Sequence, residues 1–383
     1  MNVKLRGIAA LTALAVLCGC WDRIEIEERG FVVGTAIDLT ESGAFELTFQ
    51  FAIPGAMLEK TPEAQSSDQT YQNVSAEGET LFRAARKMAN KSSRVPYMEH
   101  NKLIIVSEKL AREGRIEEAL DLFIRDHEMR RSSKVLVAKG QAKKLLTIRP
   151  RIERLPVEYI NATSENPDKS ETITPPAIVG HLHRNLLEEH SYAIPVISAM
   201  DNKASVSGAA VFHGPTNKLK GFLSGIETSG GNFFNGTIRA GVVEIEYEGE
   251  PIVFEIKDVN RRLRADVADP EHPVFDVEIS AEGNVGESYS KADLLNPSVI
   301  AEIERKVNER VRDVMESTLD KVQREYRSDV LGFGDHLREN HYRTWETVKD
   351  DWEEGKQIFS RCNVNIRVRS KIRIVGAIDR AKN

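Results

Sequence analysis

The stretch Asn296–Val322, "NPSVIAEIERKVNERVRDVMESTLDKV", decides the fold of the second half of the chain. Asn296 is a favourable N-cap, and Pro297 suits the first helical position because no helical hydrogen bond needs its missing N–H. Glu, Lys and Arg occupy one face, and apolar residues recur every three to five positions at Ile300, Ile303, Val307, Val311, Val314, Leu319 and Val322. This spacing predicts one helix of about 25 to 30 residues with its apolar face in the core of an α+β domain. A membrane-lying or partner-binding face is the alternative.

Strand patterns flank this helix on both sides. Two hairpins are predicted before it, with turns at "HGPTN" (213–217) and "EGEP" (248–251), followed by an alternating strand over residues 273–287. After it, "NVNIRVRSKIRIVG" (363–376) alternates as a last strand. Residues 201–383 are therefore predicted to form a strand-rich C-terminal α+β domain with one long helix.

The first half mixes both periodicities. Strands are expected at 30–39, 44–53, 102–106 and 134–138, with helices around 81–88 and 116–123 and a mobile loop over 57–78. Strand, helix and strand over 102–138 suggest one βαβ crossover. A linker-like zone at 161–176 precedes the predicted boundary near residue 200. The expected fold class is α+β (mixed α/β): a multi-domain body whose N-terminal mixed α/β lobe, residues 20–200, is one region or two subdomains.

The first 19 residues have the features of an export signal. Lys4 and Arg6 precede the uncharged run Ile8–Leu17, which at ten residues is too short to cross a bilayer core that needs about 20. The run continues into Leu17, Cys18, Gly19 and Cys20, which resembles the lipobox of bacterial lipoproteins. Residues 1–19 are thus predicted to be a lipoprotein signal peptide that leaves with Cys18. An uncleaved segment with a free cysteine pair is the alternative.

The lipobox resemblance implies a covalent anchor at Cys20. Such a cysteine carries a diacylglycerol thioether, with or without a further N-acyl chain such as palmitate, and two acyl chains hold a protein where one holds it only marginally. No later stretch reaches 18 uncharged apolar residues. The body after Cys20 is therefore expected to face water on the outer side of a membrane.

Composition excludes several classes of protein. The chain has 383 residues, 40% hydrophobic and 29% charged, which is typical of two or three globular domains rather than disorder. Its net charge of −6 argues against nucleic acid as a partner. With the signal removed, only Cys362 remains, so no intramolecular disulfide is expected, and Cys362 is predicted to be an inert packing residue rather than a nucleophile.

No catalytic, metal or cofactor motif is found. His181, His183 and His190 lie close in sequence, but an i,i+2 pair on a helix points two ways, whereas a zinc-binding HExxH pair is spaced i,i+4. The glycines of "SGGN" (229–232) lack the Lys-Ser/Thr of a phosphate-binding loop and predict a turn. The prediction is a protein that is not an enzyme and has no cofactor besides its lipid.

Three blocks of motif residues stand at the start, middle and end of the chain. The first begins at the lipobox cysteine and comprises Trp21, Asp22, Glu25, Gly30, Phe31, Gly34 and Asp38. The second is "GAAVFHGPTNKLKGFLSGIETSG" (208–230), with one extra residue between Phe212 and Leu219. The third comprises Asp329, Gly332, Phe333, Gly334, Trp345 and Trp352. In this order the blocks resemble the Ger(x)C lipoproteins, the C-subunits of spore germination receptors.

The third block also carries structural predictions. Gly332 and Gly334 stand where the long-helix pattern ends, which predicts a left-handed helix end there. Trp345 and Trp352 are seven residues apart, so they are predicted to share one helix face that packs on the last strand. Exposure of part of that face to a partner subunit is the alternative.

The resemblance implies a function that composition does not show. It implies a non-catalytic lipoprotein subunit of a nutrient germinant receptor, anchored on the outer face of the spore inner membrane and working with two integral-membrane subunits. Trp21, Asp22 and the C-terminal glycines and aromatic residues are then candidates for a structural signature or a partner interface. A solute-binding lipoprotein of an importer is the alternative, and it would have two similar lobes around a cleft.

Overall fold

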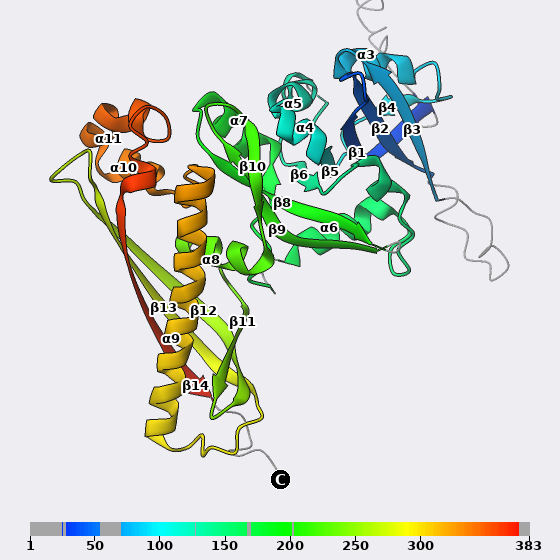
Figure 1. Ribbon diagram of the computed structural model, residues 1–383. Helices are drawn as coiled ribbons and strands as arrows, with labels where there is room; N and C mark the ends of the chain where they lie inside the picture. The colour runs from blue at the N-terminus through cyan, green and yellow to red at the C-terminus, as the bar shows by residue number, and fades with distance from the viewer. Residues whose placement is uncertain are drawn as a thin grey trace, which may run out of the picture.

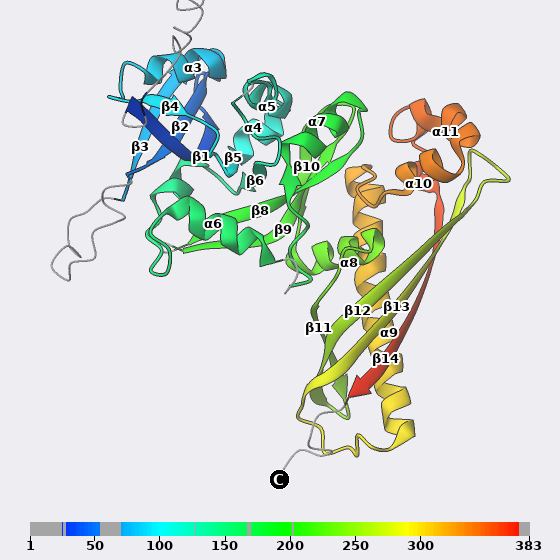
Figure 2. The ribbon, with the colours of Figure 1, turned by 180° about the vertical axis from the view of Figure 1, so that it is seen from behind.

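The computed structural model describes residue 25 and residues 28–53, 70–126, 128–166, 170–200 and 203–374. These residues form two lobes, each built on its own sheet, with the long helix α9 (Pro297–Asp320) running along the second sheet (Figures 1 and 2). The predicted class, α+β with a mixed first lobe and a strand-rich second lobe, is confirmed.

The first sheet has ten strands in the main order β10-β9-β8-β6-β5-β1-β2-β3, with β4 beside β1 and β7 beside β6. The strands are β1 (Arg29–Leu39), β2 (Phe45–Ala52), β3 (Tyr71–Gly78), β4 (Val95–Tyr97), β5 (Leu103–Ser107), β6 (Lys134–Ala138), β7 (Ala177–Ile178), β8 (Tyr192–Met200), β9 (Lys203–His213) and β10 (Lys218–Leu223). β1, β5, β6 and β8 pair in parallel, and antiparallel hairpins extend the sheet at both ends.

Helices cover both faces of this sheet. One layer contains α3 (Leu81–Met88), α4 (Glu108–Glu113), α5 (Ile116–Arg125) and α7 (Val179–Leu187), and the other contains the 3-10 helix Lys143–Thr147 and α6 (Pro156–Ser164). β5 shows the division, because Ile104 and Val106 join the first layer while Leu103 and Ile105 join the second. A strand covered on both faces has an unbroken apolar sequence, as "LIIV" does here.

The structure confirms the predicted β1–β2 hairpin and the βαβ crossover from β5 to β6. The loop predicted over 57–78 is wrong for Tyr71–Gly78, which pair with β2 along its whole length as β3. β3 is an edge strand with a largely polar sequence, and its backbone bonds to β2 hold it. Val74 and Ala76 face the core, while Ser75 Oγ on the other face lies 2.8 Å from Thr48 Oγ1. The rest of that predicted loop lies largely outside the described residues.

The second sheet has the order β11-β12-β13-β14, with β14 parallel to β13 and the other pairs antiparallel. Its strands are β11 (Gly241–Tyr247), β12 (Glu250–Asp266), β13 (Val274–Ser288) and β14 (Asn363–Ile374). The remaining elements are α8 (Gly225–Asn235), a π-helical turn at Lys321–Tyr326, α10 (Phe333–Asn340), α11 (Tyr342–Val348) and short 3-10 turns at Lys349–Asp351 and Phe359–Arg361.

The long helix is as predicted at its start and along its apolar face. The Asn296 side chain accepts a hydrogen bond from Ser298 N at 3.0 Å, and Ile303, Val307 and Val311 are at most 2% exposed. Val314 is only half-buried, and Met315 takes its place in the core. The face is therefore core, as the spacing predicted.

A second helix crosses α9 where the lobes meet. α8 lies between β10 and β11, and a Cβ added at Gly230 would stand 2.2 Å from Thr318 Oγ1 of α9. The turn predicted at "SGGN" is thus wrong, because those residues lie inside α8. Gly230 has no side chain, which allows the two helices to approach closely.

The first sheet continues past residue 200 through the β9–β10 hairpin. Ala209, Val211 and Leu223 of this hairpin belong to the same apolar cluster as the core face of α9. The two lobes therefore share core at the hairpin, and the predicted domain boundary near residue 200 stays a prediction.

We expect Val311→Asp to unfold the C-terminal lobe or prevent the protein from accumulating. An unpaired charge placed in this core costs several kcal/mol, against a total stability of about 5–15 kcal/mol. Ser317→Asp, at an exposed position of the same helix, is the matched control and should leave the thermal midpoint nearly unchanged. A normal midpoint for Val311→Asp would contradict the assignment of this face to the core.

Candidate functional site

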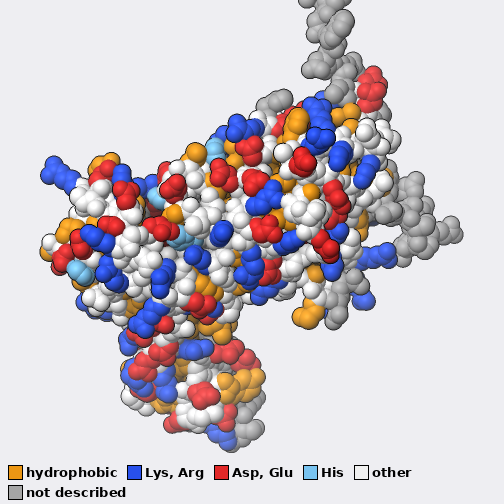
Figure 3. All heavy atoms as spheres, turned by 45° about the horizontal axis from the view of Figure 1, so that its top comes forward, with side chains coloured by type: hydrophobic (Ala, Val, Ile, Leu, Met, Phe, Trp, Pro, Cys, Tyr) orange, Lys and Arg blue, Asp and Glu red, His pale blue; other side chains and the backbone are white. Residues whose placement is uncertain are grey.

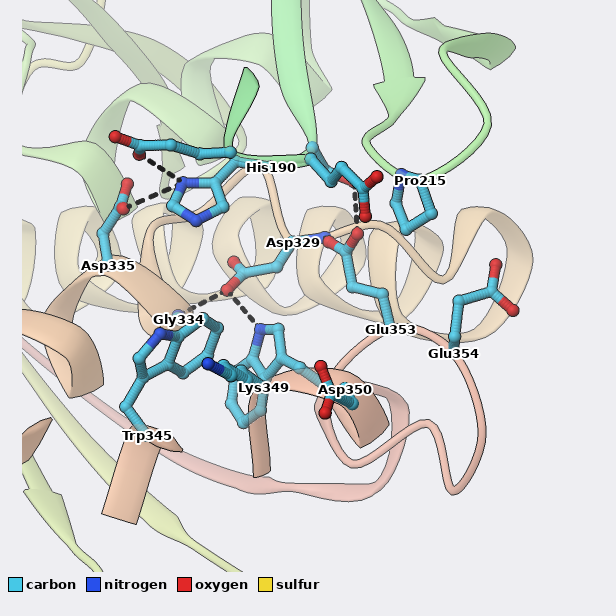
Figure 4. A pocket seen from close by; sticks show the side chains of 14 residues that line it. His190, Pro215, Asp329, Gly334, Asp335, Trp345, Lys349, Asp350, Glu353 and Glu354 are labelled. Carbon is cyan, nitrogen blue, oxygen red and sulfur yellow. Dashed lines mark hydrogen bonds and ion pairs between the residues drawn. The ribbon is translucent and has the colours of Figure 1, made fainter. Parts of the chain in front are cut away.

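The structure gathers the C-terminal signature around one buried acid, Asp329. Gly332, Phe333, Gly334, Trp345 and Trp352 all lie near it, at the end of α9 where the two lobes meet (Figures 1 and 4). The predicted lipobox Leu17, Cys18, Gly19 and Cys20, with Trp21 and Asp22, lies outside the described residues.

The loop that presents Asp329 depends on two left-handed residues. Arg327, with φ of 50°, ends the π-helical turn that follows α9, and Gly332, with φ of 77°, is the N-cap of α10. The explanation of Gly332 as the end of the long helix is therefore wrong, because Arg327 takes that place. Gly332 is still needed for its left-handed conformation, which a Cβ penalises.

The Asp329 carboxylate accepts four N–H donors. Oδ1 accepts from Leu331 N and Phe333 N at 3.2 Å each, and Oδ2 accepts from Gly334 N at 2.6 Å and Trp352 Nε1 at 2.9 Å. Burial raises the pKa of Asp329 above its ordinary value, although the hydrogen bonds from Gly334 N, Trp352 Nε1 and Phe333 N oppose this shift. Gly334 is required here, since a Cβ would stand 2.9 Å from Trp352 Nε1.

The two tryptophans belong to an aromatic cluster beneath this carboxylate. Trp345 and Trp352 are 8% and 4% exposed, and their rings meet edge to face at 5.9 Å. The prediction that one helix face carries both is wrong, because α11 ends at Val348 and a 3-10 turn leads to Trp352. Trp352 reaches the sheet through Phe275 of β13, at 6.3 Å between ring centroids. The cluster continues to Phe333 and Phe359.

Glu353 joins this cluster to the first lobe. Its Oε1 accepts a hydrogen bond from Asp329 N, and its Oε2 accepts one from Ser191 Oγ at 2.6 Å. Ser191 lies just before β8, and its Oγ in turn accepts from Gly214 N in the β9–β10 turn at 2.9 Å. Burial, and to a lesser extent Asp329, raise the pKa of Glu353 to about 8, against the ordinary 4.5.

A hollow of about 310 Å³ opens above this pair (Figure 4). His190 Nδ1 stands on its rim, 3.4 Å from Asp335 and 3.5 Å from Glu188. Arg338 pairs with both of these acids, at 2.6 Å from Glu188 and 2.9 Å from Asp335. The rim thus holds the lobes together by ion pairs between α10 and the segment after α7.

The buried polar side chains of the site are engaged in structural contacts. The carboxylate oxygens of Asp329 and Glu353 accept hydrogen bonds from backbone and side-chain groups of the fold. The free Cys362 thiol is buried, and desolvation raises its pKa to about 12, so it stays protonated. Within the described ranges, no three His, Cys, Asp or Glu side chains form a group that could hold a metal ion.

The other two signature blocks also have structural positions. Asp38 at the end of β1 is buried and accepts hydrogen bonds from Ala142 N and Lys143 N at 2.8 and 2.9 Å. A Cβ at Gly34 would stand 2.2 Å from Val157 of α6. In the middle block, Phe212 and Leu219 are register partners in the β9–β10 hairpin.

Glu353 and Ser191 are the site residues that the sequence did not single out. Glu353 is one of 59 acids, and only its place beside Trp352 in the third block could have drawn attention to it. Ser191 carries no motif at all, since its role depends on the fold bringing the start of β8 against Glu353.

We expect Trp352→Phe to lower the free energy of unfolding by about 1–3 kcal/mol more than Trp345→Phe, because it leaves one acceptor of the buried Asp329 without its donor. Both changes remove a similar volume from similarly buried rings, so the second is the volume control. Denaturant titration measures both values. Equal losses would show that the indole hydrogen bond contributes nothing.

A second expectation concerns pH. A carboxyl whose pKa rises on folding binds more protons in the folded state, so its contribution to stability is present at low pH and is lost as the pH rises from about 4.5 to about 8. Glu353 should therefore lower the free energy of unfolding across this window by up to about 1.4 kcal/mol per pH unit. Glu353→Gln should flatten that slope, and the exposed Glu354→Gln should not. Identical slopes in all three proteins would refute the raised pKa of Glu353.

None of the described helices combines the length and the apolar character needed to span a bilayer. Two family models match the chain in succession: the N-terminal domain of spore germination proteins over residues 22–199, and the domain described as spore germination B3/GerAC like, C-terminal, over residues 207–376.

Relatives match along nearly the whole chain. Spore germination protein B3 of Bacillus subtilis (strain 168) is 32% identical over 375 residues, covering 95% of this chain and 96% of that protein. Spore germination protein A3 of the same organism is 27% identical over 378 residues, covering 98% of each. The crystal structure of the GerBC protein matches with a TM-score of 0.63 and 27% identity, over 88% of this chain and 96% of that one. The two-lobed chain with its Asp329 site therefore belongs to the GerAC-like family of spore germination proteins.

Proposed function

We propose that this chain is the lipid-anchored, non-catalytic subunit of a nutrient germinant receptor in the spore inner membrane. One observation carries the proposal: both spore germination domains occur in order on one chain, and the likeness to protein B3 extends over 95% of it. The subunit would be needed for germination triggered by nutrients and would work beside two integral-membrane subunits.

The proposed anchor is the diacylglycerol-modified Cys20, with or without an added N-acyl chain. Leu17, Cys18 and Gly19 before it have the residue types of a lipobox, and β1 begins nine residues after it at Arg29. Two acyl chains suffice to hold a folded body at a membrane. The anchor therefore places the body on the outer face of the spore inner membrane without a spanning helix.

The non-catalytic role is supported by how the buried groups are used. Asp329 and Glu353 hold backbone and side-chain donors of both lobes, and Cys362 is a buried, protonated thiol. A subunit that fixes geometry between membrane partners needs such rigid joints. The C-terminal signature stabilises this joint, and it affects a partner interface only by fixing how the lobes sit. Its residues are Gly332, Phe333, Gly334, Trp345 and Trp352.

The alternative, a solute-binding lipoprotein of an importer, predicts two similar α/β lobes around a cleft. The lobes here differ, since one has a ten-stranded mixed sheet with helices on both faces and the other a four-stranded sheet crossed by one long helix. No observation favours that alternative over a receptor subunit.

We expect Cys20→Ala to abolish incorporation of labelled fatty acid, to release the protein from the membrane fraction or leave its precursor unprocessed, and to abolish nutrient-triggered germination. Cys18→Ala is the matched control, because another small residue still fits the lipobox. Metabolic labelling with fractionation measures the first two effects, and loss of spore refractility on nutrient addition measures the third. Equal labelling and retention in the wild type and Cys20→Ala would refute the anchor.

A further inference from the structure

The segment Leu81–Val95 carries five cations and no carboxylate: Arg83, Arg86, Lys87, Lys91 and Arg94. All five are exposed. The whole chain has a net charge of −6, so this local excess runs against its overall sign. The segment comprises α3 and the loop that leads into β4.

The faces of α3 are sharply divided. Leu81, Ala84 and Met88 are at most 3% exposed and pack on the first sheet. The outward face carries Phe82, Arg83, Arg86 and Lys87, at spacings that place them on one side of a helix. Phe82 and the nearby Val95 are 55% and 56% exposed, so apolar side chains stand among these cations. We define the α3 surface as the outward face of α3 together with the loop after it: Phe82, Arg83, Arg86, Lys87, Lys91, Arg94 and Val95.

The cations of the α3 surface form no ion pair with a carboxylate within the described part of the chain. Arg86 lies 5.0 Å over the Phe82 ring, and Lys87 and Lys91 donate to backbone carbonyls of β3 at 2.9 Å, contacts that leave the positive charge in place. Other exposed helices differ, since α5 pairs Arg125 with Asp121 and α9 pairs Arg305 with Glu302 and Glu309. The α3 surface is therefore positively charged as well as exposed.

Acids border this surface on two sides, one of them at the exposed Glu28, which precedes Arg29 beside β4. Glu79 precedes α3, and Glu117, Glu118 and Asp121 of α5 line a groove with Phe82. Glu118 and Asp121 are paired with Arg115 and Arg125, which reduces their effect on α3. A negatively charged partner would therefore meet the α3 surface on the side away from α5.

The position of the α3 surface near the start of β1 indicates the negatively charged partner. β4 pairs with the start of β1 so that Val95 stands beside Arg29, and the Arg94 side chain lies against Gly30. Cys20 is nine residues before Arg29, which an extended chain spans in about 30 Å at most. The proposed lipid anchor is thus tethered within about 30 Å of Arg29, a distance that allows the basic surface to reach lipid headgroups.

We propose that the α3 surface lies on the anionic headgroups of the membrane, with its cations at phosphate level and Phe82 and Val95 at the interface. The placement rests on the proposed anchor, but the attraction does not, since charge complementarity acts on an unacylated chain as well. Figure 3 shows Lys and Arg side chains at the end of the first lobe that bears α3, with hydrophobic and acidic ones between them. The C-terminal lobe, which extends away from α3 in Figures 1 and 2, then projects from the membrane.

The test uses the mature-length chain, residues 20–383 with Cys20→Ser, so that no acyl chain contributes and every described strand and helix is kept. We measure its partition onto phosphatidylcholine vesicles with and without phosphatidylglycerol, at low and high salt. Removing a cation near an anionic surface weakens partition roughly fivefold, so Arg83→Ala/Arg86→Ala/Lys87→Ala should bind anionic vesicles about 100-fold more weakly. High salt should weaken the parent in the same direction.

Two controls separate charge from fold. Arg83→Lys/Arg86→Lys/Lys87→Arg keeps the charge and should bind like the parent, while Arg310→Ala/Arg343→Ala/Arg369→Ala removes three exposed cations of the C-terminal lobe and should also bind normally. Circular dichroism and the thermal midpoint verify folding of each variant.

Two results would overturn the proposal: equal partition of the parent onto neutral and anionic vesicles, or equal partition of the parent and the Arg83→Ala/Arg86→Ala/Lys87→Ala variant onto anionic vesicles. If vesicle binding is unchanged but capture by the integral-membrane subunits is lost, the surface binds protein instead, and the proposal is wrong. The Cys20→Ala labelling experiment fails or succeeds independently of these outcomes.

Discussion

A buried carboxylate that must find donors is the constraint on which the C-terminal lobe depends. Asp329 is buried, and an ionised carboxylate there is tolerated only when hydrogen bonds replace its hydration. The four donors come from its own loop, from the first turn of α10 and from the Trp352 indole. This requirement fixes the left-handed Gly332, excludes a side chain at Gly334 and positions the aromatic cluster above β13.

The same acid sets how the lobes meet. Its backbone N–H donates a hydrogen bond to Glu353. The other carboxylate oxygen of Glu353 accepts a hydrogen bond from Ser191 of the first lobe. A second joint lies near α8, where Tyr326 Oη donates to Phe222 O at 3.0 Å and Lys321 pairs with Glu227 at 2.8 Å. Breaking one partner of a buried polar joint costs more than the joint contributes, because the other partner is left unsatisfied. The lobes are thus held in one arrangement by groups that would be costly to separate.

The sequence predicted what local periodicity controls. The length and core face of α9, the hairpins at Gly214 and Gly249, and the βαβ crossover follow from spacing and turn chemistry, and the structure confirms them. Periodicity failed where other forces decide. β3 is an edge strand that is held by backbone bonds and has only two core residues, Val74 and Ala76. "SGGN" is helical because α8 needs a small residue where it meets α9.

The candidate site was predictable in part for the same reason. Resemblance named Asp329, Gly332, Gly334 and the tryptophans, but helical spacing alone wrongly placed both tryptophans on one helix face. Glu353 and Ser191 are 162 residues apart in sequence, and nothing local in either signals the other. Such a pair exists only once two lobes have folded and docked.

Net charge is a poor guide to partners for a related reason. A value of −6 sums charges spread over the whole molecule, whereas a surface acts on what lies within about one Debye length, roughly 8–10 Å at physiological salt. Within that range, paired cations such as Arg305 contribute little beyond their own helix, and the unpaired ones on α3 add together. The sign of the whole chain counts against nucleic acid as a general partner, while the pairing of individual side chains decides which face can meet an anionic surface.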